Sequence, residues 1–149
     1  MRFFGNLEAK IDAKGRAFLP SVFRKMLQTS GEESLVLRKD IFADCLVLYP
    51  ACVWEEQTTA LRARLNRFNG DHQRIFRQYV SEVETLTLDG NGRFLIPKRY
   101  LQAAGIEQSI RFTGMDDTIE IWASEKIEES KMSSEEFSSA LQDIMGTTI

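Results

Sequence analysis

The chain has 149 residues, of which 43% are hydrophobic and 28% are charged, an ordinary composition for one globular domain or two small halves. No apolar stretch has the length of a membrane span or of a secretion signal, and a net charge of −3 taken alone argues against a nucleic-acid partner. Cys45, Cys52 and the single histidine, His72, lack the spacing of a zinc site. We therefore expect a cytoplasmic protein with two buried thiols and no metal or small-molecule cofactor.

The first fifty residues predict short strands around one short helix. Apolar residues alternate from Phe3 to Ile11, which is typical of a strand, and Asp12 to Gly15 supply turn chemistry. Residues 16–19 predict a returning strand, so this turn is expected at the tip of a β-hairpin. Pro20 favours a helix over residues 21–27. Two further strands are expected at residues 34–38 and 45–49.

The middle of the chain predicts two helices, and the second half then repeats the order of the first. Pro50 opens a helix whose apolar residues Trp54, Leu61, Leu65 and Phe68 lie near one stripe, and residues 73–80 form the next. No such pair follows the second repeat, so we interpret it as a connector. The later elements are expected as strands at 83–88, 93–96, 109–113 and 118–122 and a helix at 97–104. Ser133 to Glu136 form a capping box before an amphipathic C-terminal helix.

One motif occurs twice with identical spacing. The sequence IDAKGRAFLP at residues 11–20 returns as LDGNGRFLIP at residues 88–97, with Asp, Gly, Arg and Pro each recurring 77 positions later. Apolar residues recur with them, in the pairs Ile11/Leu88, Phe18/Leu95, Leu19/Ile96 and Phe23/Tyr100. We therefore predict four parts: a first half at 1–56, a helical connector at 57–80, a second half at 81–129 and an acidic tail at 130–149.

The charge is distributed unevenly around this repeat. Residues 1–25 and 60–99 each carry a net charge of +4, whereas residues 26–59 carry −4 and residues 100–149 carry −7. Both basic segments contain a copy of the motif or end on it. The pattern indicates a cationic face for a polyanion on an otherwise acidic body. We interpret the arginines of the helical pair as an ordinary solvated face.

Two interpretations of the motif remain open from the residues alone. In the first, the aspartate caps the turn, the glycine relieves backbone strain and the arginine pairs with the aspartate. In the second, the aspartate orients an arginine that contacts guanine edges or phosphates of DNA. Further basic residues lie near the motifs in the sequence: Lys10, Lys14, Arg24, Lys25, Lys98 and Arg99.

Catalysis has little support in this sequence. No nucleophile, metalloprotease or phosphate-loop pattern is present, and arginine is a poor general base. We expect no enzymatic activity. Two other classes stay open: a non-enzymatic protein-interaction module, and an enzyme that uses the Asp/Arg pairs on a small anionic substrate.

With two such motifs in about 150 residues, the chain resembles the MraZ family. Both copies match the family pattern Asp-x-x-Gly-Arg-x-x-x-Pro, and CLVLYPACVWEE at residues 45–56 resembles the segment that follows the first motif. The resemblance covers the chain up to Glu129. It implies an α+β, β-rich fold: a pseudo-two-fold, swapped-hairpin AbrB-like β-barrel built from two tandem repeats, with flanking helices.

The resemblance also implies a function. Members are bacterial transcriptional regulators that bind double-stranded DNA at promoter repeats of the division and cell-wall gene cluster, as homo-oligomeric rings on the nucleoid in the cytoplasm. Carried over, the DNA-binding residues are Asp12, Arg16, Asp89 and Arg93, with Lys14, Lys10 and Lys98 nearby. The second copy has Asn91 where the first has Lys14, so we expect the first turn to bind DNA more strongly.

Overall fold

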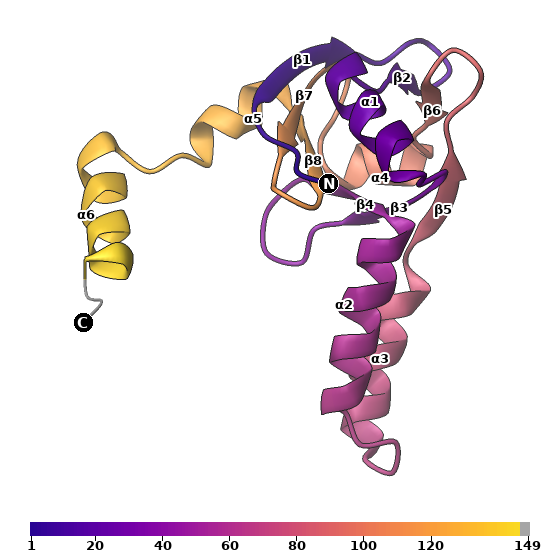
Figure 1. The fold of residues 1–149 in the computed structure, drawn as a ribbon, viewed down its shortest axis with the longest axis vertical. Helices are drawn as coiled ribbons and strands as arrows, with labels where there is room; N and C mark the ends of the chain where they lie inside the picture. Colours follow the sequence, from indigo (N-terminus) through magenta and orange to yellow (C-terminus); the bar gives the residue numbers. More distant parts are fainter. Residues whose placement is uncertain (147–149) are drawn as a thin grey trace.

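The structure is a computed structural model that describes residues 1–146 (Figure 1). Its strands are β1 (Asn6–Lys10), β2 (Arg16–Phe18), β3 (Ser34–Lys39), β4 (Leu46–Pro50), β5 (Glu84–Thr87), β6 (Arg93–Leu95), β7 (Ser109–Gly114) and β8 (Ile119–Ala123). Its helices are α1 (Ser21–Ser30), α2 (Ala51–Arg64), α3 (Gly70–Ser81), α4 (Lys98–Ala103), α5 (Ser124–Glu129) and α6 (Ser134–Met145). The second half therefore repeats the element order of the first, as the sequence predicts.

Six strands form one open antiparallel sheet in the order β1-β7-β8-β4-β3-β5, and β2 and β6 form a separate two-stranded ribbon. Exchanging each strand for its counterpart in the other half reproduces this order, so a pseudo-two-fold axis relates the halves. The α+β fold with two repeated units is confirmed. The closed β-barrel is wrong, because β1 and β5 remain at opposite edges while the short motif strands leave the sheet and pair with each other.

The strands that flank each motif pair with the other half of the chain. Within residues 1–146, β1 and β2 form no ladder with each other. Instead β1 pairs with β7, with Leu7 opposite Phe112, and β2 pairs with β6, with Ala17 opposite Phe94. The predicted hairpin is therefore wrong in its pairing, although its turn lies where expected. Local sequence specifies the turn, whereas the ladder depends on partners in the other half of the chain, such as Thr113 opposite Asn6 and Arg93 opposite Phe18.

The motif residues that follow each arginine anchor the turns in the main core. Leu19 and Ile96 are 0% and 1% exposed, and Phe23 and Tyr100 on the helices that follow are also buried. Pro20 and Pro97 stand at the N-caps of those helices, α1 and α4. Because apolar burial is the dominant favourable term in folding, this packing holds both turns on a rigid base.

Helices α2 and α5 cover the opposite face of the large sheet. Two smaller apolar clusters lie there, one containing Val36, Val47, Tyr49 and Val53, the other Cys45, Trp122 and Ile127. Coverage on both faces explains why every residue of β4 is buried. The expectation of two buried thiols is wrong for Cys52, which is exposed in the first turn of α2, where its neighbour Val53 takes the buried position.

Helices α2 and α3 form a hairpin that projects from the body (Figure 1). Asn69 caps α3 by accepting hydrogen bonds from the N–H groups of Asp71 and His72. Of the apolar stripe predicted along this pair, Trp54 packs against the Val36 cluster and stacks on Tyr79, whereas Phe68 is 97% exposed at the tip of the hairpin. Helix α2 begins before residue 57, and the division of the chain into four parts stays a prediction.

Helix α6 stands away from the body at the C-terminal end (Figure 1). The predicted cap is confirmed, since the Ser133 hydroxyl accepts a hydrogen bond from the Glu136 N–H at 3.1 Å. Across the described part of the chain, none of the helices combines the length and apolarity needed to span a membrane.

Candidate nucleic-acid interface

Each motif turn is built by its own aspartate. Asp12 accepts hydrogen bonds at Oδ1 from the backbone N–H groups of Lys14 and Arg16, both at 2.9 Å. Its Oδ2 accepts from Arg16 Nε at 2.9 Å. In the second turn Asp89 accepts from the N–H groups of Asn91 and Arg93 at 2.8 and 2.9 Å and from Arg93 Nε at 2.9 Å. The turn-capping role predicted for both aspartates is confirmed.

A glycine with a left-handed backbone closes each turn. Gly15 has a φ of +89° and Gly92 a φ of +82°, a region that side chains with a Cβ rarely adopt. Each glycine N–H donates to the carbonyl oxygen of the aspartate three residues earlier, at 3.0 Å. The recurrence of glycine at this spacing therefore has a conformational cause.

The two turns are fastened to each other. Leu19 N–H donates to Gly92 O at 3.0 Å, and Ile96 N–H donates to Gly15 O at 2.9 Å. In the ribbon between them, Arg16 lies opposite Leu95 and Phe18 lies opposite Arg93. Cross-strand neighbours project from the same face of a ribbon, so the two arginines share one face. Figure 1 shows this end of the body directed away from the α2–α3 hairpin.

Both motif arginines are held at Nε and open at their outer ends. The side chains of Arg16 and Arg93 are 32% and 27% exposed. Within residues 1–146 the Nη atoms of neither arginine have a hydrogen-bond partner. A planar guanidinium fixed at one edge presents its other donors as a fork that matches a phosphate or a guanine edge.

Two apolar side chains lie on the same face of the ribbon as the two arginines, and the sequence did not identify them as site residues. Phe18 is 56% exposed and Leu95 is 53% exposed, and the Arg93 guanidinium carbon lies 5.8 Å from the centroid of the Phe18 ring. Strand alternation was the available signal, because Ala17 and Phe94 point to the core and their neighbours must point outward. The face therefore combines two cations with two apolar contact surfaces.

The aspartates remain ionised at neutral pH. The backbone N–H of Arg16 is the main cause that lowers the pKa of Asp12, and that of Arg93 acts in the same way on the pKa of Asp89. A carboxylate held in its charged form by these donors is a weak proton acceptor. The turns therefore orient charge and lack the proton-transfer group that acid–base catalysis requires.

The predicted lysines lie around the first turn. Lys14 is exposed within that turn. A hollow beside the turn is lined by Lys14, by Lys98 at the start of α4 and by Glu107. Lys10 is exposed at the end of β1, two residues before the turn. The second turn has a different neighbour, since Arg24 of α1 donates from Nη1 to the Asn91 carbonyl oxygen at 3.1 Å.

The arginines of the α2–α3 hairpin are arranged differently. Arg62 lies over the Phe76 ring at 4.5 Å, and Arg74 pairs with Asp71 at 3.6 Å between side chains that are 79% and 84% exposed. Such exposed pairs contribute little to stability or orientation. Arg67, Arg74 and Arg77 are exposed surface charges, whereas Arg62 is half-buried and also donates from Nη1 to Gln73 Oε1 at 3.3 Å.

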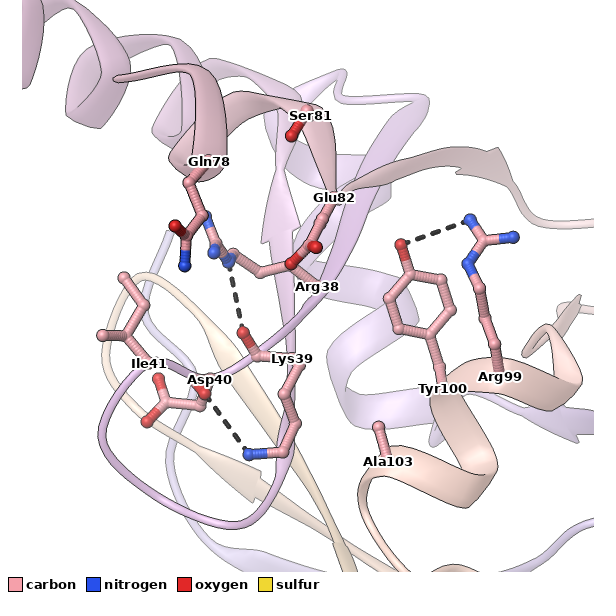
Figure 2. Close-up of a pocket in the computed structure, with 10 residues that line it drawn as sticks. All are labelled: Arg38, Lys39, Asp40, Ile41, Gln78, Ser81, Glu82, Arg99, Tyr100 and Ala103. Carbon is pink, nitrogen blue, oxygen red and sulfur yellow. Dashed lines mark hydrogen bonds between the residues drawn. The ribbon is translucent and has the colours of Figure 1, made fainter. Parts of the chain in front are cut away.

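A separate hollow of about 650 Å³ lies between the loop after β3, the end of α3 and helix α4 (Figure 2). Its cations already have internal partners. Arg38 donates to Tyr79 O at 2.7 Å, Lys39 donates to Ala43 O at 2.9 Å, and Arg99 pairs with Glu84. No group of three potential metal ligands occurs within residues 1–146. The Arg38 contact joins α3 to the sheet, and the Arg99 pair joins α4 to β5.

Comparison with known proteins points to a single family. Residues 3–78 and residues 80–145 each match the family model described as "MraZ protein, putative antitoxin-like". A protein of Phocaeicola vulgatus named transcriptional regulator MraZ is 62% identical over 147 residues, covering 99% of this chain and 96% of its own length. Proteins of the same name from Bacteroides fragilis and Christiangramia forsetii are 57% and 34% identical, covering 97% and 98% of this chain and 92% and 94% of their own lengths.

Proposed function

The chain belongs to the MraZ family of transcriptional regulators, which are not enzymes, and from this premise we propose that its paired motif turns bind promoter DNA. One observation carries the proposal. Arg16 and Arg93 lie on one face of one ribbon, each fixed by its aspartate and each with unbound Nη donors. An arginine that is already ordered loses less side-chain entropy when it contacts DNA than a free surface arginine does.

Within this proposal the site residues have different roles. Arg16 and Arg93 contact DNA directly, and Asp12 and Asp89 orient them. Lys14, Lys10 and Lys98 contribute charge that attracts phosphates around the first turn. Exposed Phe18 and Leu95 lie between the arginines, where apolar side chains can contact sugars or thymine methyl groups.

We further propose that the protein acts as a homo-oligomeric ring on repeated promoter sites of the division and cell-wall gene cluster, on the nucleoid in the cytoplasm. Copies that engage successive repeats raise one another's effective concentration, so modest charge per copy suffices for tight binding. Helix α6 supports an assembly contact because it stands off the body with Phe137 59% exposed and Leu141 47% exposed. Light scattering after gel filtration should show a closed oligomer, and Phe137→Glu with Leu141→Glu should reduce its size.

The DNA proposal is tested by fluorescence anisotropy with a duplex taken from upstream of the protein's own gene. A shuffled duplex of equal length and composition is the control. We expect the native duplex to bind at least ~10³-fold more tightly at physiological salt, and binding to weaken steeply as salt rises. Equal affinity for both duplexes would refute sequence-specific recognition.

The alternative function is a non-enzymatic protein-interaction module. It is favoured by one observation, the projecting α2–α3 hairpin with Phe68 97% and Ile75 53% exposed. Absence of binding to either duplex at low salt would support this alternative over DNA binding.

A further inference from the structure

The two turns differ in the cation that stands beside them. The first turn carries Lys14, and the second has the neutral Asn91 at the equivalent place. The helices that follow the motifs differ in the same sense. Arg24 on α1 corresponds to Leu101 on α4, because 77 residues separate equivalent positions. The first half therefore carries both cations at these two positions and the second half carries neither, yet Arg24 lies in space beside the second turn.

Arg24 lies directly against the second turn. Besides the 3.1 Å hydrogen bond from Nη1 to Asn91 O, the space next to Gly92 is filled by this side chain. A Cβ on Gly92 would lie 2.0 Å from Arg24 Nη1 and 2.6 Å from its Cδ. Beside Gly15, the first turn has the apolar Leu101 at the equivalent place, and a Cβ on that glycine would lie 3.7 Å from Leu101 Cδ1.

The charge of Arg24 is uncompensated, unlike that of the motif arginines. Arg16 and Arg93 each form an ion pair with an aspartate at 2.9 Å, whereas within residues 1–146 Arg24 forms no ion pair. Its partner on the second turn is a neutral carbonyl oxygen. Glu32, which lines the hollow beside Arg24, accepts hydrogen bonds from the N–H groups of Ser34 and Cys52 instead.

We propose that Arg24 contributes to the second turn the DNA-phosphate contact that Lys14 contributes to the first, which rests on the proposed DNA-binding function. One Nη donor holds the guanidinium against the turn, and the remaining donors of a half-buried side chain stay available for a phosphate. The contact crosses the halves of the chain. Arg24 reaches the second turn because α1 follows β2 directly and β2 pairs with β6.

The test compares Arg24→Ala and Arg24→Gln with Lys25→Ala, which removes an exposed cation from the next position of the same helix. Affinity for the upstream duplex is measured across a salt series. We expect both Arg24 variants to lose about threefold to tenfold in affinity and about one unit in the slope of log K against log salt. Lys25→Ala should stay within about twofold, because nothing places that side chain at a turn.

A relocated cation provides the second arm of the test. Asn91→Lys introduced into the Arg24→Ala protein should recover the lost affinity and the lost salt slope. The inference is overturned if Arg24→Gln keeps the wild-type salt slope, because the arginine would then only support the turn. It is also overturned if Asn91→Lys restores nothing in a variant that melts like the wild type. A wild-type protein that binds no DNA at low salt would instead refute the proposed function itself.

Discussion

The two motif turns share one framework and differ in what surrounds it. Their hydrogen bonds from aspartate to backbone and to arginine agree within 0.1 Å, and both close on a left-handed glycine. Around that framework, the first turn has Lys14 and Lys98, whereas the second has Asn91 and Arg24. The comparison teaches that the repeat preserves how an arginine is held, while the additional charge comes from different elements.

The largest expected effect comes from removing either motif arginine. Arg16→Ala and Arg93→Ala should each weaken binding to the upstream duplex by about 10- to 100-fold, as measured by anisotropy, because each removes a preorganised bidentate donor. From the sequence alone, the first turn is expected to bind more strongly. Arg24 adds a cation beside the second turn, which a comparison of Lys14 with Asn91 leaves out. We therefore expect the two variants to lose affinity equally within about threefold. A loss of affinity more than tenfold larger for Arg16→Ala than for Arg93→Ala would show that the first turn binds DNA more strongly, as the sequence alone predicts.

Substituting the turn glycines should have a smaller effect, which differs between the turns because the residues around them differ. Gly15→Ala and Gly92→Ala should each destabilise the fold by about 1 to 2 kcal/mol in urea unfolding, since both positions have positive φ. At Gly15 the new Cβ would lie 3.1 Å from the Ile96 carbonyl oxygen, which belongs to the backbone and cannot move aside easily. At Gly92 it meets the flexible end of Arg24 and displaces it.

Gly92→Ala should therefore lose more DNA affinity for a given loss of stability than Gly15→Ala. Titrations of both variants well below their melting temperatures measure the difference. Equal losses of affinity would show that the position of Arg24 is irrelevant to binding.

The smallest effect concerns pH. The folded-state pKa of Asp12 and Asp89 is lowered below the unfolded value of about 3.9, so their stabilisation is present above that pH and is lost as the pH falls through the folded-state pKa. Urea unfolding at pH 5 and pH 3 should thus show a larger loss of stability for the wild type than for the Asp12→Asn, Asp89→Asn protein. Parallel losses would mean that these carboxylates contribute no pH dependence.

Much of the local structure follows from the sequence, because its causes are local. The 77-residue repeat, the aspartate and glycine of each turn, and the prolines before α1 and α4 all act within a few residues. The pairing of β1 with β7 and of β3 with β5 could not be predicted in this way, because identical turn chemistry serves a hairpin or an exchange between halves. The open sheet instead of a closed barrel follows from the same long-range choice.

The site was predicted in part for the same reason. The bond from each aspartate to its arginine spans four residues and is implied by the motif. The contact of Arg24 with Asn91 spans 67 residues and depends on α1 crossing to the other half. Phe18 and Leu95 are exposed because the other face of the ribbon packs on the core. Their recurrence in the repeat does not specify which face that is.

One comparison tests the central claim most directly, that DNA binds at the fixed arginines of the turns and not at the exposed arginines of the hairpin. The Arg16→Ala, Arg93→Ala protein is titrated with the upstream duplex beside the Arg67→Ala, Arg77→Ala protein, which removes the same charge from exposed sites. We predict a loss of about 100-fold or more for the first protein and less than about threefold for the second, with both melting like the wild type. Wild-type affinity in the first protein together with a large loss in the second would contradict the account.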